Sequence, residues 1–290
     1  MRHVISRMLY LHALTPLHTG TGQAVAVIDL PIARERATGW PVVPASGLKA
    51  VLRDALDDGS NREWIEVAFG PPTERASESA GGLHFADQRI LCFPVRSFFG
   101  TFAYATCPLA LTRFVRDCHA AGIPVPFGDT RPLVDEMAAK IPQNGRLVRN
   151  GKIYLEDLDL DSQPSEEAGS VAEGLARVLF ADGTDKQGFR ERLAIVSDLV
   201  FDFLSETATE VTARVRLKDD TKTVDSGGLW YEESVPAEAI FYGPVLVAPQ
   251  RRGEAGEMLK PFDEADGMLV QIGGKASVGR GLCRLMVGQP

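Results

Sequence analysis

The chain carries His18-Thr-Gly-Thr-Gly22, Ile28-Asp-Leu-Pro-Ile-Ala-Arg-Glu-Arg-Ala-Thr-Gly-Trp-Pro41 and Pro44-Ala-Ser-Gly-Leu-Lys-Ala-Val-Leu-Arg53 in close succession. The first stretch is a glycine-rich loop, and it follows the alternating strand pattern of Met8–Leu14. The second is a long excursion before the third, which predicts a helix. Ser46 is a good N-cap, and apolar residues recur after it at helical spacing. A strand, a long loop and a helix therefore open the fold.

The rest of the chain alternates short strands with a few helices. Pro108 is placed to open a helix at its tolerated first position, and Ser170 with Glu173 forms a capping box before another. Residues 121–170 are rich in Pro, Gly and acids, and we interpret them as a variable insertion. We predict an α+β fold in a single domain, residues 1–290.

Strand character marks the remaining apolar stretches. Pro94 interrupts the first of them, and a polar segment that we expect to be mobile, Lys218–Gly228, separates the last two. The predicted strands are His84–Ser97, Thr207–Leu217 and Leu229–Val247.

Composition and charge constrain the class of protein. The chain has 290 residues with 44% apolar residues and a net charge of −8, which argues against a generic polyanion binder. The charge is uneven, because 84–116 holds four arginines and one acid, whereas 155–173 holds seven acids and no base. This asymmetry fits one basic and one acidic face. Without a membrane-length apolar run or a signal-peptide pattern, we expect a soluble, cytoplasmic protein with buried cysteine thiols.

Two segments have the character of phosphate-binding sites. Near the C-terminus, glycines surround Lys275 and Arg280, so the backbone can approach a polyanion closely. The alternative is an ordinary glycine-rich turn. In the first predicted helix, Lys49 and Arg53 share a face behind Ser46, where a helix N-terminus favours anions, although spacing alone favours a solvated face.

Asp29 is the candidate for chemistry. A single carboxylate in the apolar run 25–31 could hold a divalent cation or position a 2′-hydroxyl, although an aspartate before Leu-Pro also makes a turn cap. His18 could act as acid or base, although loop histidines are more often structural. Glu232 and Glu233 form an acidic pair, which in most proteins is simply solvated.

In this order the motifs resemble one family, the repeated backbone subunit of the type III-B (Cmr) CRISPR effector within the RAMP superfamily. The resemblance covers both ends and much of the middle of the chain, and nothing aligns within 121–170. Besides the three opening stretches and the closing glycine loop, it rests on Phe93-Pro-Val-Arg-Ser97, Thr106-Cys-Pro108 and Leu229-Trp-Tyr-Glu-Glu233.

The resemblance implies a modified ferredoxin-like (RRM-like) core with a protruding hairpin, the thumb. It implies that copies of the chain stack in a filament along a guide RNA, together with other Cmr subunits. Each thumb would interrupt the duplex of guide and single-stranded target RNA and splay out a nucleotide. Asp29 would then cleave the target there with Mg²⁺ or Mn²⁺ bound, and His18 and Glu232 would be helpers. Contacts to the guide RNA would come from Ser46, Lys49, Arg53, Gly273, Gly274, Lys275, Gly279, Arg280 and Gly281.

Elementary chemistry agrees with a site this small. Attack by the 2′-hydroxyl on its own phosphate needs in-line geometry, which A-form duplex denies and a splayed nucleotide can reach. Three other interpretations stay open: a purely structural RNA-binding subunit, an endoribonuclease that matures the guide RNA around His18, and a small-molecule enzyme. The last lacks a nucleotide-binding fingerprint.

Overall fold

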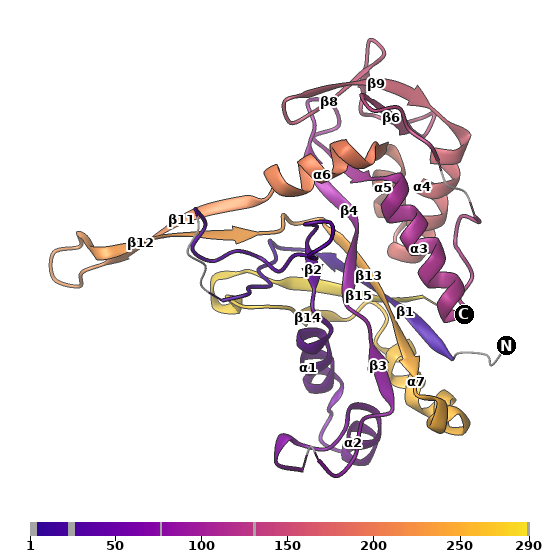
Figure 1. Cartoon of the computed structure of the whole chain (residues 1–290), viewed down its shortest axis with the longest axis vertical. Coiled ribbons are helices and arrows are strands. Elements are labelled where there is room, and N and C mark those ends of the chain that lie inside the picture. Colours follow the sequence, from indigo (N-terminus) through magenta and orange to yellow (C-terminus); the bar gives the residue numbers. More distant parts are fainter. Residues whose placement is uncertain (1–4, 23–26, 76, 130–131, 289–290) are drawn as a thin grey trace.

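The computed structural model describes residues 5–22, 27–75, 77–129 and 132–288. A long mixed sheet forms the body, and helices pack against both of its faces (Figure 1). In the described residues this sheet has 13 strands. They are β1 (Ser6–Ala13), β2 (Val42–Val43), β3 (Leu83–Phe85), β4 (Gln88–Arg96), β5 (Phe102–Thr106), β6 (Ala138–Ile141), β7 (Val148–Arg149), β8 (Lys152–Leu155), β9 (Leu158–Pro164), β10 (Leu193–Val196), β13 (Ile240–Val247), β14 (Leu269–Gln271) and β15 (Leu282–Gly288).

The strand order is β14-β15-β1-β13-β4-β5-β10-β6-β9-β8-β7, with β2 added beside β4 and β3 beside β13. A second, two-stranded sheet consists of β11 (Glu210–Leu217) and β12 (Val224–Ser234). The α-helices are α1 (Ala45–Leu56), α2 (Arg62–Phe69), α3 (Pro108–Ala121), α4 (Glu166–Leu179), α5 (Gly183–Arg192), α6 (Asp198–Thr207) and α7 (Ala255–Glu264). The predicted α+β class is confirmed.

The predicted first strand is confirmed as β1, and it lies between β13 and β15. Leu9 and Leu11 point into a core that includes side chains of α1, α2 and α7. Met8 and Tyr10 point into a second core with α3 and α4. Because helices cover both faces, both sets of alternating side chains are buried. The four cysteines are buried free thiols, as predicted.

The first helix begins differently from the prediction. It starts at Ala45 with Pro44 in the N-cap position, and Ser46 is exposed inside the first turn. A carboxylate distant in sequence caps the helix N-terminus in place of Ser46, because Asp87 Oδ1 accepts a hydrogen bond from the Ala45 amide at 2.7 Å. Similarly, α4 begins after Ser165, whose hydroxyl accepts from the Ala168 amide, so the predicted capping box at 170–173 lies within the helix.

One further prediction, the interruption of a strand at Pro94, is corrected in the main sheet. Pro94 lies within β4, opposite Tyr104 of β5, and does not interrupt the strand. The pairing of β4 with β13 ends at Cys92, so the missing amide hydrogen of Pro94 costs no ladder hydrogen bond on that side. The break falls instead at 86–87, between β3 and β4. The expected insertion, 121–170, extends the sheet through β6, which pairs with β10.

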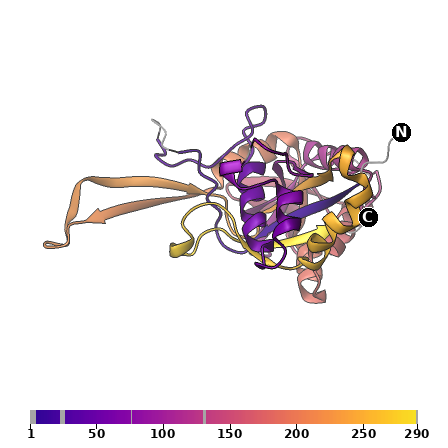
Figure 2. The same cartoon turned by 90° about the horizontal axis from the view of Figure 1, so that it is seen from below.

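The two-stranded sheet of β11 and β12 is a hairpin that projects far beyond the body (Figures 1 and 2). The predicted mobile segment at 218–228 is only partly a loop, because β12 already begins at Val224. Cross-strand partners place exposed apolar side chains on one face of the hairpin. This apolar face consists of Val211, Val215, Leu217, Val224, Leu229 and Tyr231, each between 42% and 54% exposed. In the described part of the chain, no helix has the length and apolar character to cross a membrane.

Candidate functional site at the base of the hairpin

Asp29 lies against the base of the hairpin. Its Oδ2 accepts a hydrogen bond from the Tyr231 amide at 2.7 Å. The next residue, Leu30, pairs with β12 through its amide to Tyr231 O (3.1 Å) and through its carbonyl to the Glu233 amide (3.0 Å). The segment that carries Asp29 therefore contacts β12 through an isolated parallel bridge at Leu30. The hydrogen bond from the Tyr231 amide fixes the position of the carboxylate. Asp29 is partly exposed, so a ligand can reach it.

His18 also contacts β12, at the carbonyl of Glu233. Its Nδ1 lies 2.6 Å from Glu233 O, and because a carbonyl can only accept, Nδ1 carries the proton. His18 is 6% exposed, and a Cβ on Gly20 would stand 2.7 Å from its Nε2. His18 thus fills a closed position. Its role as acid or base stays a prediction, and the contacts favour a role in holding the site together.

Glu232 is buried, in contrast to the solvated acidic pair that its sequence context favours. Its carboxylate meets Lys275 Nζ at 2.5 Å, Trp230 Nε1 at 2.7 Å and Arg214 Nε at 3.2 Å. Burial by itself raises the pKa of Glu232, but the hydrogen bonds and charges of these partners outweigh burial and lower it to about 2. Glu232 is therefore ionised at neutral pH. With all three partners in place, it binds the hairpin to the glycine loop.

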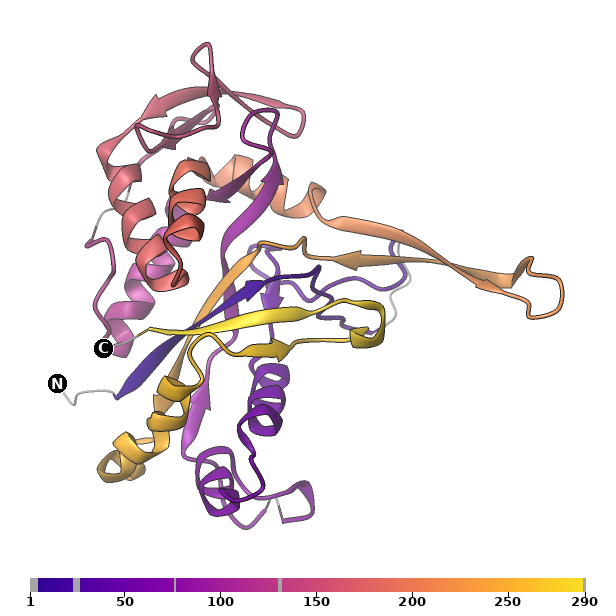
Figure 3. The ribbon, with the colours of Figure 1, turned by 180° about the vertical axis from the view of Figure 1, so that it is seen from behind.

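The glycine loop between β14 and β15 extends along the base of the hairpin (Figures 2 and 3). Gly273 and Gly281 are required there, because a Cβ would stand 2.3 Å from His18 O and 2.1 Å from Ile272 O respectively. Both cations of the loop already have acidic partners: Lys275 pairs with Glu232, and Arg280 with Glu210 at 2.8 Å. The predicted contacts of Gly273, Gly274, Lys275, Gly279, Arg280 and Gly281 with RNA stay predictions, and the loop's charge is largely balanced within the chain.

The candidates on α1 form a separate group. Lys49 is partly exposed, and Arg53 Nη1 donates to Gly70 O at 2.7 Å, which ties α1 to the end of α2. In the described residues no hydrogen bond or ion pair connects this group to Asp29. Guide-RNA binding by Ser46, Lys49 and Arg53 stays a prediction.

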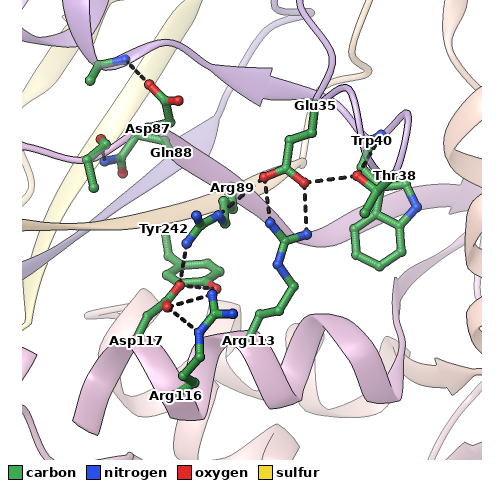
Figure 4. Close-up of polar contacts among 12 residues, drawn as sticks. Glu35, Thr38, Trp40, Asp87, Gln88, Arg89, Arg113, Arg116, Asp117 and Tyr242 are labelled. Atoms are coloured by element: carbon green, nitrogen blue, oxygen red, sulfur yellow. Dashed lines mark hydrogen bonds and ion pairs between the residues drawn. The ribbon is translucent and has the colours of Figure 1, made fainter. Parts of the chain in front are cut away.

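A charge network holds the chain beyond Asp29 onto the body (Figure 4). Glu35 accepts two hydrogen bonds from Arg113 of α3, at 2.6 and 2.8 Å, and one from Arg89 at 3.2 Å. Burial raises the pKa of Glu35, but these arginines outweigh it and lower the pKa overall. Asp117 in turn binds Arg89 and Arg116. Three of the four arginines in 84–116 are thus paired internally, which corrects the expectation of a basic face built from them.

Sequence reasoning named Glu233 only as half of an acidic pair and gave it no part in the site. Its carboxylate binds Arg34, the Ile32 amide and the Thr209 hydroxyl, and its side chain is only 4% exposed. A sequence signal for its burial exists, because consecutive side chains of a strand point to opposite faces. Where other segments cover both faces of the strand, neither of two consecutive glutamates can be solvated.

The described residues contain no group of three or more His, Cys, Asp and Glu side chains placed to hold a metal ion. Asp29 therefore offers one carboxylate. Mg²⁺ is commonly bound by one or two carboxylates together with substrate phosphates and water, so this donor set fits a cation shared with a nucleic acid.

Comparison with known proteins identifies the family. The RAMP superfamily matches residues 10–284. The CRISPR system Cmr endoribonuclease Cmr4 of Pyrococcus furiosus is 38% identical over 280 residues, which cover 95% of this chain and 93% of that protein. The chain belongs to the RAMP superfamily and to its Cmr4 family. The family recognised in the sequence is therefore confirmed.

Solved structures agree with this assignment. Oligomeric Cmr4 from Pyrococcus furiosus has a TM-score of 0.79 at 30% identity, with 97% of each chain covered. A chain of the type III-B Cmr-beta complex bound to cognate target RNA has a TM-score of 0.76 at 20% identity, covering 99% of this chain and 98% of that one. The second likeness extends to the fold alone.

Proposed function

We propose that this chain is the RNA-cleaving backbone subunit of a type III-B CRISPR ribonucleoprotein. Copies of it line the guide RNA in a filament with other Cmr subunits, and each cleaves the paired target RNA. The observation that carries the proposal is the Tyr231 amide on Asp29 Oδ2, which fixes a carboxylate at the base of the hairpin. Support for the activity comes from the 38% identical relative, whose name is that of an endoribonuclease. We place such a subunit in the cytoplasm.

The hairpin supplies the geometry for cleavage in this proposal. Its exposed apolar face runs from the tip to Tyr231, next to Asp29. Apolar side chains that insert between base steps unstack them, so this face is suited to interrupt the guide–target duplex. A nucleotide splayed out at the base of the hairpin can reach the in-line geometry that A-form duplex denies. We assign the body to a modified ferredoxin-like core, with β11 and β12 as its thumb.

Asp29 has a defined part in this reaction. Its Oδ2 is engaged by a backbone amide, so the carboxylate is oriented before RNA arrives. A divalent cation, Mg²⁺ or Mn²⁺, held jointly by Asp29 and the target phosphate would stabilise the charge that develops on the phosphate oxygens. Glu232 and His18 hold the glycine loop and β12 together around this carboxylate, and we propose them as helpers through position.

The test compares Asp29→Asn with wild type in the reconstituted complex. Asparagine keeps an oxygen for the Tyr231 amide and removes the charge, so it separates chemistry from anchoring. Asp266→Asn is the matched control, because Asp266 Oδ1 likewise accepts a backbone amide, that of Val287 at 2.9 Å, away from the hairpin.

We expect regularly spaced cuts from wild type and Asp266→Asn, and a loss of about 1000-fold or more in Asp29→Asn with target binding unchanged. EDTA should stop the wild-type reaction, and added Mg²⁺ or Mn²⁺ should restore it. Undiminished cutting by Asp29→Asn would refute the proposal and leave a structural subunit.

A further inference from the structure

Glu232 and Glu233 are neighbours in sequence but serve opposite sides of β12. Side chains alternate along a strand, so the two carboxylates point away from each other. Glu232 faces the glycine loop through Lys275. Glu233 faces the segment that carries Asp29, through Arg34 and the Ile32 amide. The carboxylate of Glu233 therefore acts on the segment that carries Asp29, and that of Glu232 on the glycine loop.

The surroundings of Glu233 form a closed set of contacts. Oε2 accepts from the Ile32 amide at 3.1 Å, and Oε1 accepts from the Thr209 hydroxyl at 3.0 Å and from Arg34 Nη2 at 2.5 Å. Its backbone completes the set, because its amide donates to Leu30 O and its carbonyl accepts from His18. Glu233 therefore contacts two chain segments at the base of the hairpin, the one that carries Asp29 and the one that carries His18.

Arg34 extends this connection to the body. Besides Glu233, its guanidinium donates through Nη1 to Gly39 O at 2.8 Å and to Ser205 O at 3.1 Å, near the end of α6. The side chain of Arg34 is 23% exposed and that of Glu233 is 4% exposed, so little water is available to replace either partner. Without the carboxylate, the Ile32 amide and one end of the guanidinium would lose their acceptor.

We propose that Glu233 is a positioning residue that sets the place of Asp29. It acts through Arg34 and the amide of Ile32, three residues after Asp29, and fixes where the segment that carries Asp29 lies on β12. The inference rests on the proposed function, since it assigns Glu233 a part in the reaction that Asp29 performs. Glu233 does not itself touch the reacting atoms.

The experiment uses the complex reconstituted with guide RNA and measures the single-turnover cleavage rate at saturating target, together with target affinity. Glu233→Gln keeps the shape and one oxygen, which can serve Ile32 or Arg34 but not both, and Glu233→Ala removes both acceptors. Asp263→Asn is the control for loss of an arginine–carboxylate pair, because Asp263 of α7 accepts two hydrogen bonds from Arg7 of β1. Hydrogen exchange is followed on residues 28–34.

We expect a graded loss of rate, about 10-fold in Glu233→Gln and about 100-fold in Glu233→Ala, because displacement of a catalytic group by about 1 Å costs about 100-fold. Affinity should stay within about twofold, and exchange at 28–34 should rise in the same order. Asp263→Asn should cut at the wild-type rate.

A wild-type rate in both Glu233 variants, beside an inactive Asp29→Asn, would overturn this inference and leave the proposed function intact. A wild-type rate in Asp29→Asn would overturn the proposed function instead. Exchange at 28–34 would still report the positioning in that case. A rate loss with unchanged exchange would also overturn the positioning role of Glu233, because the effect would then not pass through the segment that carries Asp29.

Discussion

Glu232 gives the sharpest quantitative prediction, because its buried carboxylate has three polar partners that lower its pKa strongly. Its three partners lower it from 4.5 to about 2. That difference corresponds to about 3 kcal/mol of folding free energy while the group is ionised. Since the folded pKa lies below the unfolded one, this stability is fully present above pH 4.5 and is lost as the pH falls toward 2. At pH 3 about 1 kcal/mol should remain.

The perturbation is Glu232→Gln, and the assay is urea unfolding of the purified chain at several pH values between 7 and 3. The free energy of unfolding of wild type should exceed that of the variant by about 3 kcal/mol at pH 7, plus a constant for the unpaired Lys275 and Arg214. The gap should narrow by about 2 kcal/mol at pH 3. Glu254→Gln, an exposed pair with Arg251, should change stability by less than about 0.5 kcal/mol throughout. An equal gap at pH 7 and pH 3 would refute the reasoning.

Two other predictions concern RNA. Lys49→Met should weaken guide-RNA binding and reduce the salt dependence of the affinity by about one charge, measured by filter binding at several salt concentrations. An unchanged salt slope would exclude Lys49 from the RNA interface. Arg53→Met should instead lower the free energy of unfolding in urea by about 1 kcal/mol, because Gly70 O loses its donor. Replacing 216–226 by a short turn should leave the unfolding midpoint within about 2 °C, because these residues belong to a separate two-stranded sheet. The shortened hairpin should bind target but lose regular cutting, and retention of the wild-type cutting pattern would contradict its role.

Much of the fold was predictable where the signal is local. The alternation in β1 and the proline at the first position of α3 specify their elements from neighbouring residues alone. The glycine loop was also predictable, because Gly273, Gly279 and Gly281 adopt the left-handed region, which glycine enters without steric cost. Predictions failed where a distant residue replaced a local one, as Asp87 does for Ser46 at the start of α1.

The candidate site divides in the same way. The sequence by itself determined which residue types stand near each other along the chain, and its motifs were sufficient to select Asp29, His18 and Glu232. Only the tertiary structure brought Asp29 and His18 to β12, the strand that carries Glu232, across sequence separations of about 200 residues. The structure also decided which charges are available. Lys275 and Glu232 cancel each other because folding places them 2.5 Å apart, and a buried charge must find a partner where the chain packs.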